Sequence, residues 1–263
     1  MAESGNPVPR IGIAGITGRM GRLLAEEIPA AGAVVAGGTS RDPAATPPAG
    51  ATRFADIAAL AAASDVVVDF THAAAVVPHA AALAAAGVAW VLGTSGLSAA
   101  DEAAVDRAAA AIPLVYAANF SPGVSLVLAL AERMAAALPA DQYDAEIVEM
   151  HHRQKVDAPS GTAIGIGRAV AAGRGVRLED VTESGRHGHT GPRRTGAIGF
   201  AALRGGQVVG EHTLLFAAAT EQIALTHRAF DRRAFASGAV RAALWAAGRK
   251  PGRYDMADVL GMR

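Results

Sequence analysis

The residues with the clearest chemical potential lie together within the segment EMHHRQKVDAPSGTA. Two adjacent histidines, His151 and His152, precede Lys155 and a Pro-Ser-Gly-Thr turn that opens a helix at Gly161 and Thr162. The segment therefore combines a titratable acid, a cation and free backbone N–H groups at a helix N-terminus. Such groups could bind a dianionic substrate and also protonate it. Each residue alone has an ordinary structural explanation, but their proximity favours a substrate site.

A metal centre is the competing use for so many histidines. The sequence has no cysteine and no HExxH motif, so two common zinc patterns are missing. We therefore expect no metal. The histidines that such a metal centre could use are His151, His152, His187, His189 and His212.

A second candidate site is the run GIAGITGRMG, from Gly12 to Gly21. A pyrophosphate group needs backbone N–H groups at close range and a helix N-terminus directed at it, and side chains at the turn would block its approach. Gly15 and Gly18 meet that need, and Gly21 would let the helix pack closely on the sheet. The glycines could also serve a tight turn with no ligand. Arg19 could clamp a phosphate or be an ordinary solvated residue.

The end of the second predicted strand bears on the choice of cofactor. Enzymes that use NAD usually have an acidic residue there, which accepts hydrogen bonds from the ribose. This chain has Thr39, Ser40 and Arg41 instead. A hydroxyl followed by a guanidinium suits the 2′-phosphate of NADPH, so we expect NADPH to be preferred and NADH to be possible. Arg41 could also be an ordinary surface arginine.

Short apolar runs alternate with helical stretches as far as Ala118, which predicts βαβ units and a parallel sheet. Right-handed crossovers wind such units in the Rossmann manner, with ligands at the carboxyl ends of the strands. We expect a dinucleotide-binding domain over residues 1–121. Its predicted strands are 10–14, 33–38, 65–70, 88–92 and 114–117, and its predicted helices are 19–29, 55–63, 74–86 and 99–111.

The rhythm changes after Asn119, which predicts a smaller α+β domain over residues 122–232 with a mostly antiparallel sheet. Arg-Gly-Gly predicts a hairpin between strands 196–203 and 207–216. The sheet is too large for the few helices available, so self-association is the economical way to cover it. The other predicted elements are a helix at 122–138, strands at 143–150 and 221–227, a long loop at 173–195, and helices at 232–247 and 255–260.

The composition limits the functional class. With 51% hydrophobic residues the chain can bury a core, and 24 basic residues balance 24 acidic ones. A net charge of zero gives no general attraction to nucleic acid or to an anionic membrane. Residues 1–10 do not resemble a signal peptide and predict a short loose tail, and the apolar stretch 73–92 is too interrupted to span a membrane. Together with the lack of cysteine, this predicts a cytoplasmic protein.

Across nearly the whole chain the sequence resembles the dihydrodipicolinate reductase family, whose members are also called 4-hydroxy-tetrahydrodipicolinate reductases. The HHRxKxDxPSGTA run is the most specific part of this resemblance. The segments that carry it are AGITGRMG, VVVDFTH at 66–72, VLGTSG at 91–96, AANFSPGV at 117–124, HHRQKVDAPSGTA at 151–163, GAIGF, GEHTLLF and the closing DMADVLG.

The resemblance implies an NAD(P)H-dependent oxidoreductase of lysine and diaminopimelate biosynthesis. It reduces a cyclic dicarboxylate, formed from pyruvate and aspartate semialdehyde, to tetrahydrodipicolinate. The resemblance also implies a homotetramer built through the second domain and a C-terminal segment, 233–263, that returns to the first domain. His151 and Lys155 would be catalytic, and His152, Lys155, Gly161 and Thr162 would bind substrate. Gly15, Ile16, Thr17, Gly18, Arg19, Met20, Arg41, Gly93, Thr94, Ser95, Ala117, Ala118, Asn119 and Phe120 would bind the cofactor.

Two rival functions remain open at this point. One is a related Rossmann oxidoreductase that acts on another small amino or keto acid. The other is a regulator that binds NADPH without catalysis, against which the complete HHRQK segment argues. Family members that use NADH well often have an acid where Ser40 stands, so the serine argues against efficient use of NADH.

Overall fold

A computed structural model describes residues 8–262 of the chain. The chain divides into two compact units. Unit 1 contains the chain up to Pro122 together with the segment from Arg233 onward, and unit 2 is Gly123–Arg232. Each unit has a hydrophobic core of its own. The expected N-terminal tail falls largely on residues 1–7, which lie outside the described residues.

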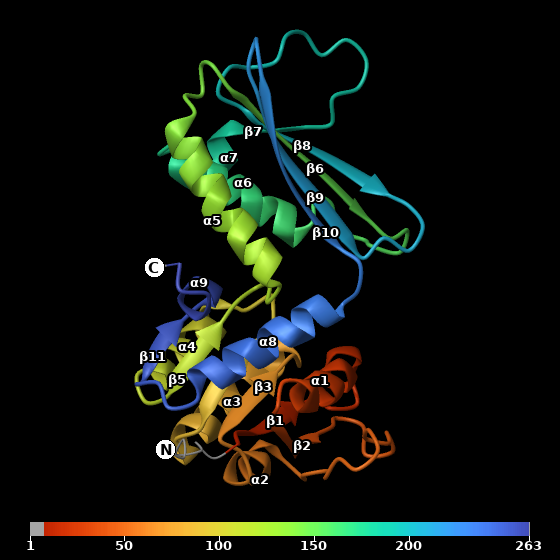
Figure 1. The fold of residues 1–263 in the computed structure, drawn as a ribbon, viewed down its shortest axis with the longest axis vertical. Coiled ribbons are helices and arrows are strands. Elements are labelled where there is room, and N and C mark those ends of the chain that lie inside the picture. Colours follow the sequence, from red (N-terminus) through yellow and green to blue (C-terminus); the bar gives the residue numbers. More distant parts are fainter. Residues whose placement is uncertain (1–7, 263) are drawn as a thin grey trace, which may run out of the picture. The chain divides into compact units, whose positions relative to one another are not determined.

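Unit 1 is built on a six-stranded parallel sheet in the order β11-β5-β4-β3-β1-β2 (Figure 1). This confirms the predicted Rossmann-type parallel sheet. The chain places β2 on one side of β1 and β3 on the other, so the strand order reverses at β1. Ligands bind to doubly wound sheets at the carboxyl ends beside such a reversal. The strands are β1 (Arg10–Ala14), β2 (Val34–Thr39), β3 (Val66–Asp69), β4 (Ala89–Leu92), β5 (Pro113–Tyr116) and β11 (Gly252–Tyr254).

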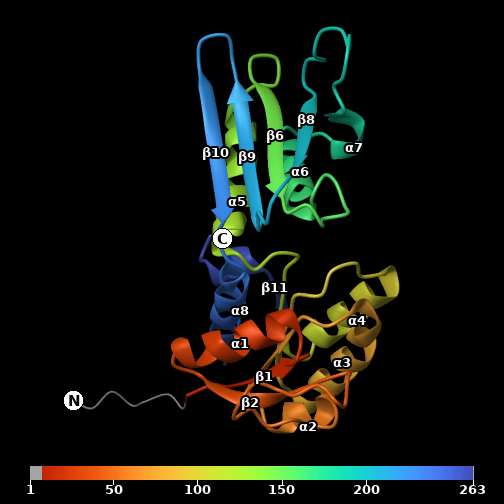
Figure 2. The same cartoon turned by 90° about the vertical axis from the view of Figure 1, so that its right-hand side faces the viewer.

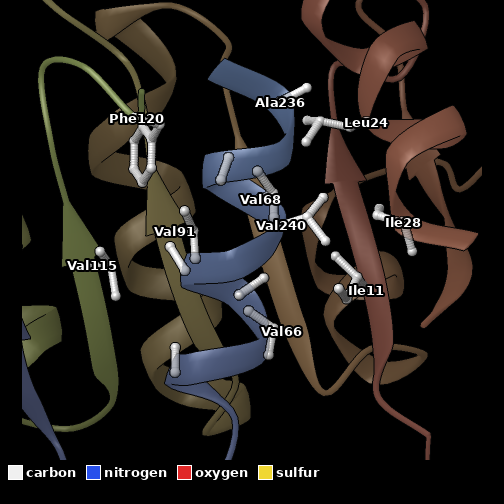
Figure 3. Close-up of a cluster of buried hydrophobic side chains, with 14 of the residues drawn as sticks. Ile11, Leu24, Ile28, Val66, Val68, Val91, Val115, Phe120, Ala236 and Val240 are labelled. Atoms are coloured by element: carbon white, nitrogen blue, oxygen red, sulfur yellow. The ribbon is translucent and has the colours of Figure 1, made fainter. Parts of the chain in front are cut away.

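Helices cover both faces of this sheet because its strands are apolar on both sides. Val66 and Val68 face one core, and Val67 between them faces the other. Figure 3 shows the first core, where Val240 lies near Val68 and Leu24 lies beside Ala236. The helices α1 (Arg19–Ala30) and α8 (Arg233–Ala246) lie on this face, and α2 (Ile57–Ala62), α3 (Ala73–Ala86) and α4 (Ala99–Ala109) lie on the other. A short helix, α9 (Met256–Val259), ends the unit.

Unit 2 has a mixed five-stranded sheet in the order β10-β9-β6-β8-β7. The helices α5 (Pro122–Ala137) and α6 (Gly161–Gly173) lie on one face of it (Figure 2). The antiparallel partners are β10 with β9 and β9 with β6, whereas β8 is parallel to both β6 and β7. The strands are β6 (Asp144–His151), β7 (Thr182–Ser184), β8 (Ile198–Arg204), β9 (Gly210–Ala217) and β10 (Gln222–Ala229).

The predicted hairpin between residues 196–203 and 207–216 is wrong. The two segments form β8 and β9, but β6 lies between them and pairs with both. Strands β8 and β9 are two strand spacings apart, a distance of about 10 Å. The five residues of the connection at 205–209 can span it, because each extended residue covers about 3.3 Å. Gly205 and Gly206 therefore mark a change of direction without fixing which strand lies alongside.

Short elements account for the other differences from the predictions. The segment 173–195, predicted as a loop, contains the one-turn helix α7 (Leu178–Val181) and the three-residue strand β7. Strand β11 was not predicted, because three residues after a proline carry no periodicity. It adds to the edge of the parallel sheet beside β5. Its Arg253 forms ion pairs with Glu102 and Asp106 of α4, which fasten this edge. Within residues 8–262, no helix combines the length and apolar character needed to cross a bilayer.

Candidate active site

The first candidate site is a groove of about 680 Å³ in unit 1, at the carboxyl ends of β1, β2 and β3. Of the residues expected to bind the cofactor, Gly15, Thr17, Gly18 and Arg41 line it. The rest of the wall comes from the loop after β2, the beginning of α2 and residues 70–79. The groove therefore lies where the strand order reverses, as expected for a dinucleotide site.

The glycine loop after β1 leaves the first amides of α1 available to a ligand. Gly15 has a φ of 80°, and the N–H groups of Gly15 and Ile16 donate to the Thr39 carbonyl at 3.1 and 2.9 Å. In the described chain no side chain caps α1 at Gly18, so the N–H groups of its first turn lack intrahelical acceptors. A Cβ added to Gly21 would lie 2.2 Å from the Gly15 carbonyl oxygen. The loop therefore fits an anion at a helix N-terminus.

Three other residues predicted to bind the cofactor, Ile16, Arg19 and Met20, differ in the groups that they expose to a ligand. Ile16 is fully buried, and its N–H is already bonded, so it anchors the loop in the core. Arg19 and Met20 are the first residues of α1. Their contribution to a phosphate would come from first-turn backbone amides, supplemented by the exposed Arg19 guanidinium.

The end of β2 is tied to the glycine loop by hydroxyl groups. Ser40 donates to the Asp42 carbonyl at 3.0 Å, so the 2.7 Å contact between Thr17 Oγ1 and Ser40 Oγ has Thr17 as its donor. Arg53 holds the next turn by donating to the carbonyls of Asp42 and Pro43. Arg41 remains exposed on the groove wall. A guanidinium placed there could reach a phosphate on the adenosine ribose.

The segments after β4 and β5 lie at the same edge of the sheet but do not line this groove. Gly93 donates to the Asp69 carbonyl at 2.8 Å, and a Cβ on it would lie 2.2 Å from the Phe70 ring. Thr94 is buried, and its hydroxyl has no hydrogen-bond partner within residues 8–262. Phe120 packs edge-on against Phe70 with ring centroids 5.5 Å apart. The remaining predicted cofactor residues here, Ser95, Ala117, Ala118 and Asn119, belong to the same two segments.

Behind the groove wall lies a buried carboxylate, Asp69, that was not predicted as a site residue. Asp69 is fully buried and accepts from the Thr71 hydroxyl at 2.6 Å, and its other oxygen lies 2.7 Å from His79 Nδ1. Thr71 and His79 both line the groove. The position of VVVDFTH at the end of the third strand was a signal for these residues, because ligands contact carboxyl ends of successive strands.

The second candidate site is the turn of unit 2 that joins β6 to α6. His151 is the last residue of β6, and α6 begins at Gly161 with Ser160 as its N-cap, where the Ser160 hydroxyl accepts from the Ala163 N–H. Between them, Lys155 Nζ donates to both carboxylate oxygens of Asp157 at 2.7 and 2.8 Å. These contacts lower the pKa of the Asp157 carboxyl. One turn therefore contains the expected histidines, the lysine and the helix N-terminus with Gly161 and Thr162.

A buried glutamate supports this turn, although it was not among the predicted residues. Glu149 is 1% exposed, and Arg204 donates to both of its oxygens at 2.9 and 2.8 Å. His151 Nδ1 lies 2.6 Å from one oxygen, and the Ser160 N–H donates to the other at 3.1 Å. Burial raises the pKa of the Glu149 carboxyl, but the hydrogen bonds from Arg204, His151 and Ser160 outweigh it and leave the pKa below its usual range. Glu149 is therefore a carboxylate.

The remaining histidines occupy different environments. His212 is 4% exposed, and its Nε2 lies 3.0 Å from Ser160 Oγ. Burial, assisted by the charge of His151, lowers the pKa of His212 to about 4, so this imidazole is neutral at pH 7. His152 has a buried Nδ1 without a partner in the described residues. His187 and His189 are exposed on the loop before β8. Residues 8–262 contain no group of three or more histidine or acidic side chains arranged to hold a metal ion.

Comparison with known families decides what kind of chain carries these two candidate sites. The family model described as "Dihydrodipicolinate reductase, N-terminus" matches residues 9–120, and the one described as "Dihydrodipicolinate reductase, C-terminus" matches residues 123–260. The chain belongs to the dihydrodipicolinate reductase family. The boundary between the two matches falls next to Pro122, where unit 1 gives way to unit 2.

Curated relatives agree with this assignment over almost their whole length. The chain is 71% identical to the 4-hydroxy-tetrahydrodipicolinate reductase of Granulibacter bethesdensis over 255 residues, which are 97% of each protein. It is 67% identical to the protein of the same name from Gluconacetobacter diazotrophicus, over 96% of this chain and 97% of the relative. Both units are thus shared with these dihydrodipicolinate reductases.

The fold is shared with a solved dihydrodipicolinate reductase as well. The structure described as dipicolinate-bound dihydrodipicolinate reductase from Paenisporosarcina sp. TG-14 aligns with a TM-score of 0.78 and 23% identity. The alignment covers 95% of this chain and 98% of the other. At this identity the likeness concerns the fold alone, namely a parallel-sheet unit followed by a mixed-sheet unit.

Proposed function

We propose that this dihydrodipicolinate reductase converts 4-hydroxy-tetrahydrodipicolinate to tetrahydrodipicolinate in the lysine and diaminopimelate pathway of the cytoplasm, with NAD(P)H as reductant. The observation that carries this proposal is the unit 2 turn, which holds an imidazole, an ammonium group and a helix N-terminus within 12 residues. A cyclic dicarboxylate needs cations and amides for its two carboxylates, and a reduced ring needs a proton. Membership of the family and the high identity to reductases of this name support the same reaction.

The residues of the turn have distinct roles in this proposal. His152, Lys155 and the amides of Gly161 and Thr162 hold the substrate carboxylates, where a helix N-terminus favours negative charge. The substrate loses its 4-hydroxyl group as water, and hydride addition leaves an electron-rich enamine carbon. His151 or Lys155 delivers the proton to that carbon. The Lys155 ammonium group donates to the Asp157 carboxylate. A substrate carboxylate could take the place of Asp157 in this contact.

The groove of unit 1 fits a dinucleotide, which supplies the hydride when bound. The uncapped first turn of α1 leaves amides for the pyrophosphate, and the close approach at Gly21 lets α1 pack against the glycine loop. Arg41 on the wall and the lack of an acid at Ser40 favour NADPH over NADH in this proposal. The segments 93–95 and 117–120 would line the nicotinamide side, at the ends of β4 and β5.

A homotetramer formed through unit 2 is part of the proposal. The face of its sheet opposite α5 and α6 carries Val148 and Ala201, which pair in the strand register, and Leu215, which is opposite Glu146. Leu203, on the same face, is 51% exposed. An apolar patch such as Val148, Ala201 and Leu203 is normally covered, and a second copy of the chain would cover it.

The assay that tests the function follows NADPH absorbance after addition of freshly synthesised substrate. The proposal predicts oxidation of NADPH that depends on the pyruvate and aspartate semialdehyde condensation product. Oxidation only with a different amino or keto acid would support the related oxidoreductase, and NADPH binding without oxidation of any of these compounds would support a regulator. Either result would overturn the proposal.

A further inference from the structure

The Glu149 carboxylate has no remaining capacity to accept hydrogen bonds. Each of its oxygens receives one N–H from Arg204, at 2.9 and 2.8 Å. One oxygen is also 2.6 Å from His151 Nδ1, and the other accepts from the Ser160 N–H at 3.1 Å. Four contacts use the approximately four lone-pair sites of a carboxylate. A charged side chain that is 1% exposed persists only when it is satisfied in this way.

This saturation determines which nitrogen of His151 carries hydrogen. An ionised carboxylate only accepts hydrogen bonds, so Nδ1 must be the donor in the 2.6 Å contact. The neutral imidazole therefore has its hydrogen on Nδ1, and Nε2 carries the lone pair that takes up and releases a proton. In histidine catalysis, the orientation and tautomer of the ring are commonly set by the partner of the nitrogen that does not react.

The neighbours of the His151 ring hold it in one place. A Cβ on Gly210 would lie 3.0 Å from His151 Nε2, so a side chain there would press against the ring, and glycine leaves it room. His212 packs edge-on against the ring with centroids 5.1 Å apart. Because His212 is neutral at pH 7, it adds no positive charge beside the His151 ring.

The same carboxylate also fixes the turn that begins α6. It accepts the N–H of Ser160, whose hydroxyl caps the helix that presents Gly161 and Thr162. Arg204 adds a bond to the Asp157 carbonyl at 2.6 Å, next to the carboxylate that holds Lys155. We propose that Glu149 is a positioning residue of the reductase, which fixes His151 as the Nδ1–H tautomer and aligns it with the amides of α6. This inference rests on the proposed function, and it assigns to Glu149 the positioning of the proposed acid His151.

The direct test is the tautomer of His151 in the unmodified protein. Long-range ¹H–¹⁵N correlation spectra of histidine-labelled enzyme, titrated until the imidazole is neutral, distinguish an N–H nitrogen from a bare one. The His151 signals are assigned by their loss in His151→Asn. We expect a neutral His151 with hydrogen on Nδ1 and a bare Nε2. Hydrogen on Nε2 would overturn the inference. Because the spectra are recorded on the unmodified protein, this result depends neither on the folding of a variant nor on the substrate of the enzyme.

The kinetic test is Glu149→Gln, with Glu146→Gln as its matched control. Glu146 is also on β6 and is also paired with arginines, Arg186 and Arg193, but it points to the opposite face of the sheet. An amide cannot accept both the Arg204 fork and the imidazole N–H, so the tautomer should change. We expect kcat to fall by about 10²-fold or more in Glu149→Gln, with a His151 spectrum that contains Nε2–H, and to stay within about twofold in Glu146→Gln.

The outcomes separate this inference from the proposed function. A folded Glu149→Gln with wild-type kcat and an unchanged His151 spectrum would overturn the positioning role while the reductase assignment stands. A wild-type enzyme that does not reduce the substrate would overturn the assignment, and the spectra of the unmodified protein would still decide the role of Glu149.

Discussion

Lys155 is one of only two lysines in the chain, and the 24 basic residues therefore include 22 arginines. A position that needed only a positive charge for a carboxylate would be served by arginine, whose planar fork binds carboxylates well. A lysine kept there indicates a group that can release a proton, which arginine, with a pKa above about 12, cannot do. Its contact with Asp157 shows that the ammonium group is also placed to hold an anion.

Substitution of this lysine separates the two roles. We predict that Lys155→Arg and Lys155→Ala each lower kcat by about 10²- to 10⁴-fold, the usual contribution of a positioned acid. NADPH affinity should be unchanged, because Lys155 does not line the groove proposed for the cofactor. The matched control is Lys250→Arg at the other lysine, which should leave kcat unchanged. Near-normal kcat in Lys155→Arg would leave Lys155 as an electrostatic anchor and His151 as the acid.

His212 provides a prediction for pH. Its pKa of about 4 in the folded state lies below the ordinary value of 6.5, so the unfolded chain binds more protons between these values. The stabilisation is complete above about pH 6.5 and is lost as the pH falls toward 4. A shift of this size is worth about 2 kcal/mol between pH 7 and pH 5.

Urea unfolding at pH 7 and pH 5 measures this contribution. His212→Gln should reduce the loss of unfolding free energy on acidification by about 2 kcal/mol. The control His189→Gln replaces an exposed histidine and should show the same loss as the wild type. The same pH dependence in His212→Gln and wild type would show that His212 is not the titrating group.

At the residue scale, the sequence predicted the groups with distinctive chemistry but not the groups that hold them. His151, Lys155 and the α6 N-terminus were recognisable because they are adjacent in the chain. Glu149, Arg204 and His212 come together only because β8 and β9 flank β6 in the sheet. Spacing along the chain contains no information about that pairing, so no sequence pattern indicated the buried carboxylate network.

At the scale of the elements, periodicity predicted the long helices and the buried strands, each to within a few residues. The predicted helix 19–29 is α1, and the predicted strand 10–14 is β1. The failures were the three-residue strands β7 and β11 and the connection from β8 to β9. Short strands have no period to recognise, and a glycine pair shows that the chain turns but not which neighbour it meets.

The end of β2 supports a prediction about the cofactor. Arg41 lines the groove, and Ser40 stands where enzymes that use NAD have an acid. We predict that NADPH binds more tightly than NADH by about 1 to 3 kcal/mol, because guanidinium and phosphate form charge-assisted hydrogen bonds. Calorimetry on Arg41→Ala should show this difference lost, with Arg107→Ala of α4 as a control. Equal affinities in the wild type would contradict the prediction.

At the scale of the whole molecule, the exposed apolar face of the unit 2 sheet predicts assembly. Val148, Leu203 and Leu215 lie on the face opposite the helices. Light scattering at micromolar protein should give about four times the chain mass of 26.5 kDa. A Leu203→Asp change should lower the measured mass because it places a charge in the apolar contact. A monomeric mass for the wild type would refute assembly through this face.

The proposed reaction transfers a hydride from the reduced nicotinamide cofactor to the ring of the cyclic dicarboxylate. The most direct measurement is mass spectrometry of the product formed with NADPH deuterated at the transferred position of the nicotinamide. We predict tetrahydrodipicolinate that contains one deuterium, in an amount equal to the NADPH consumed, and hardly any product with Lys155→Ala. Product without deuterium, or unchanged substrate in the presence of NADPH and wild-type enzyme, would contradict it.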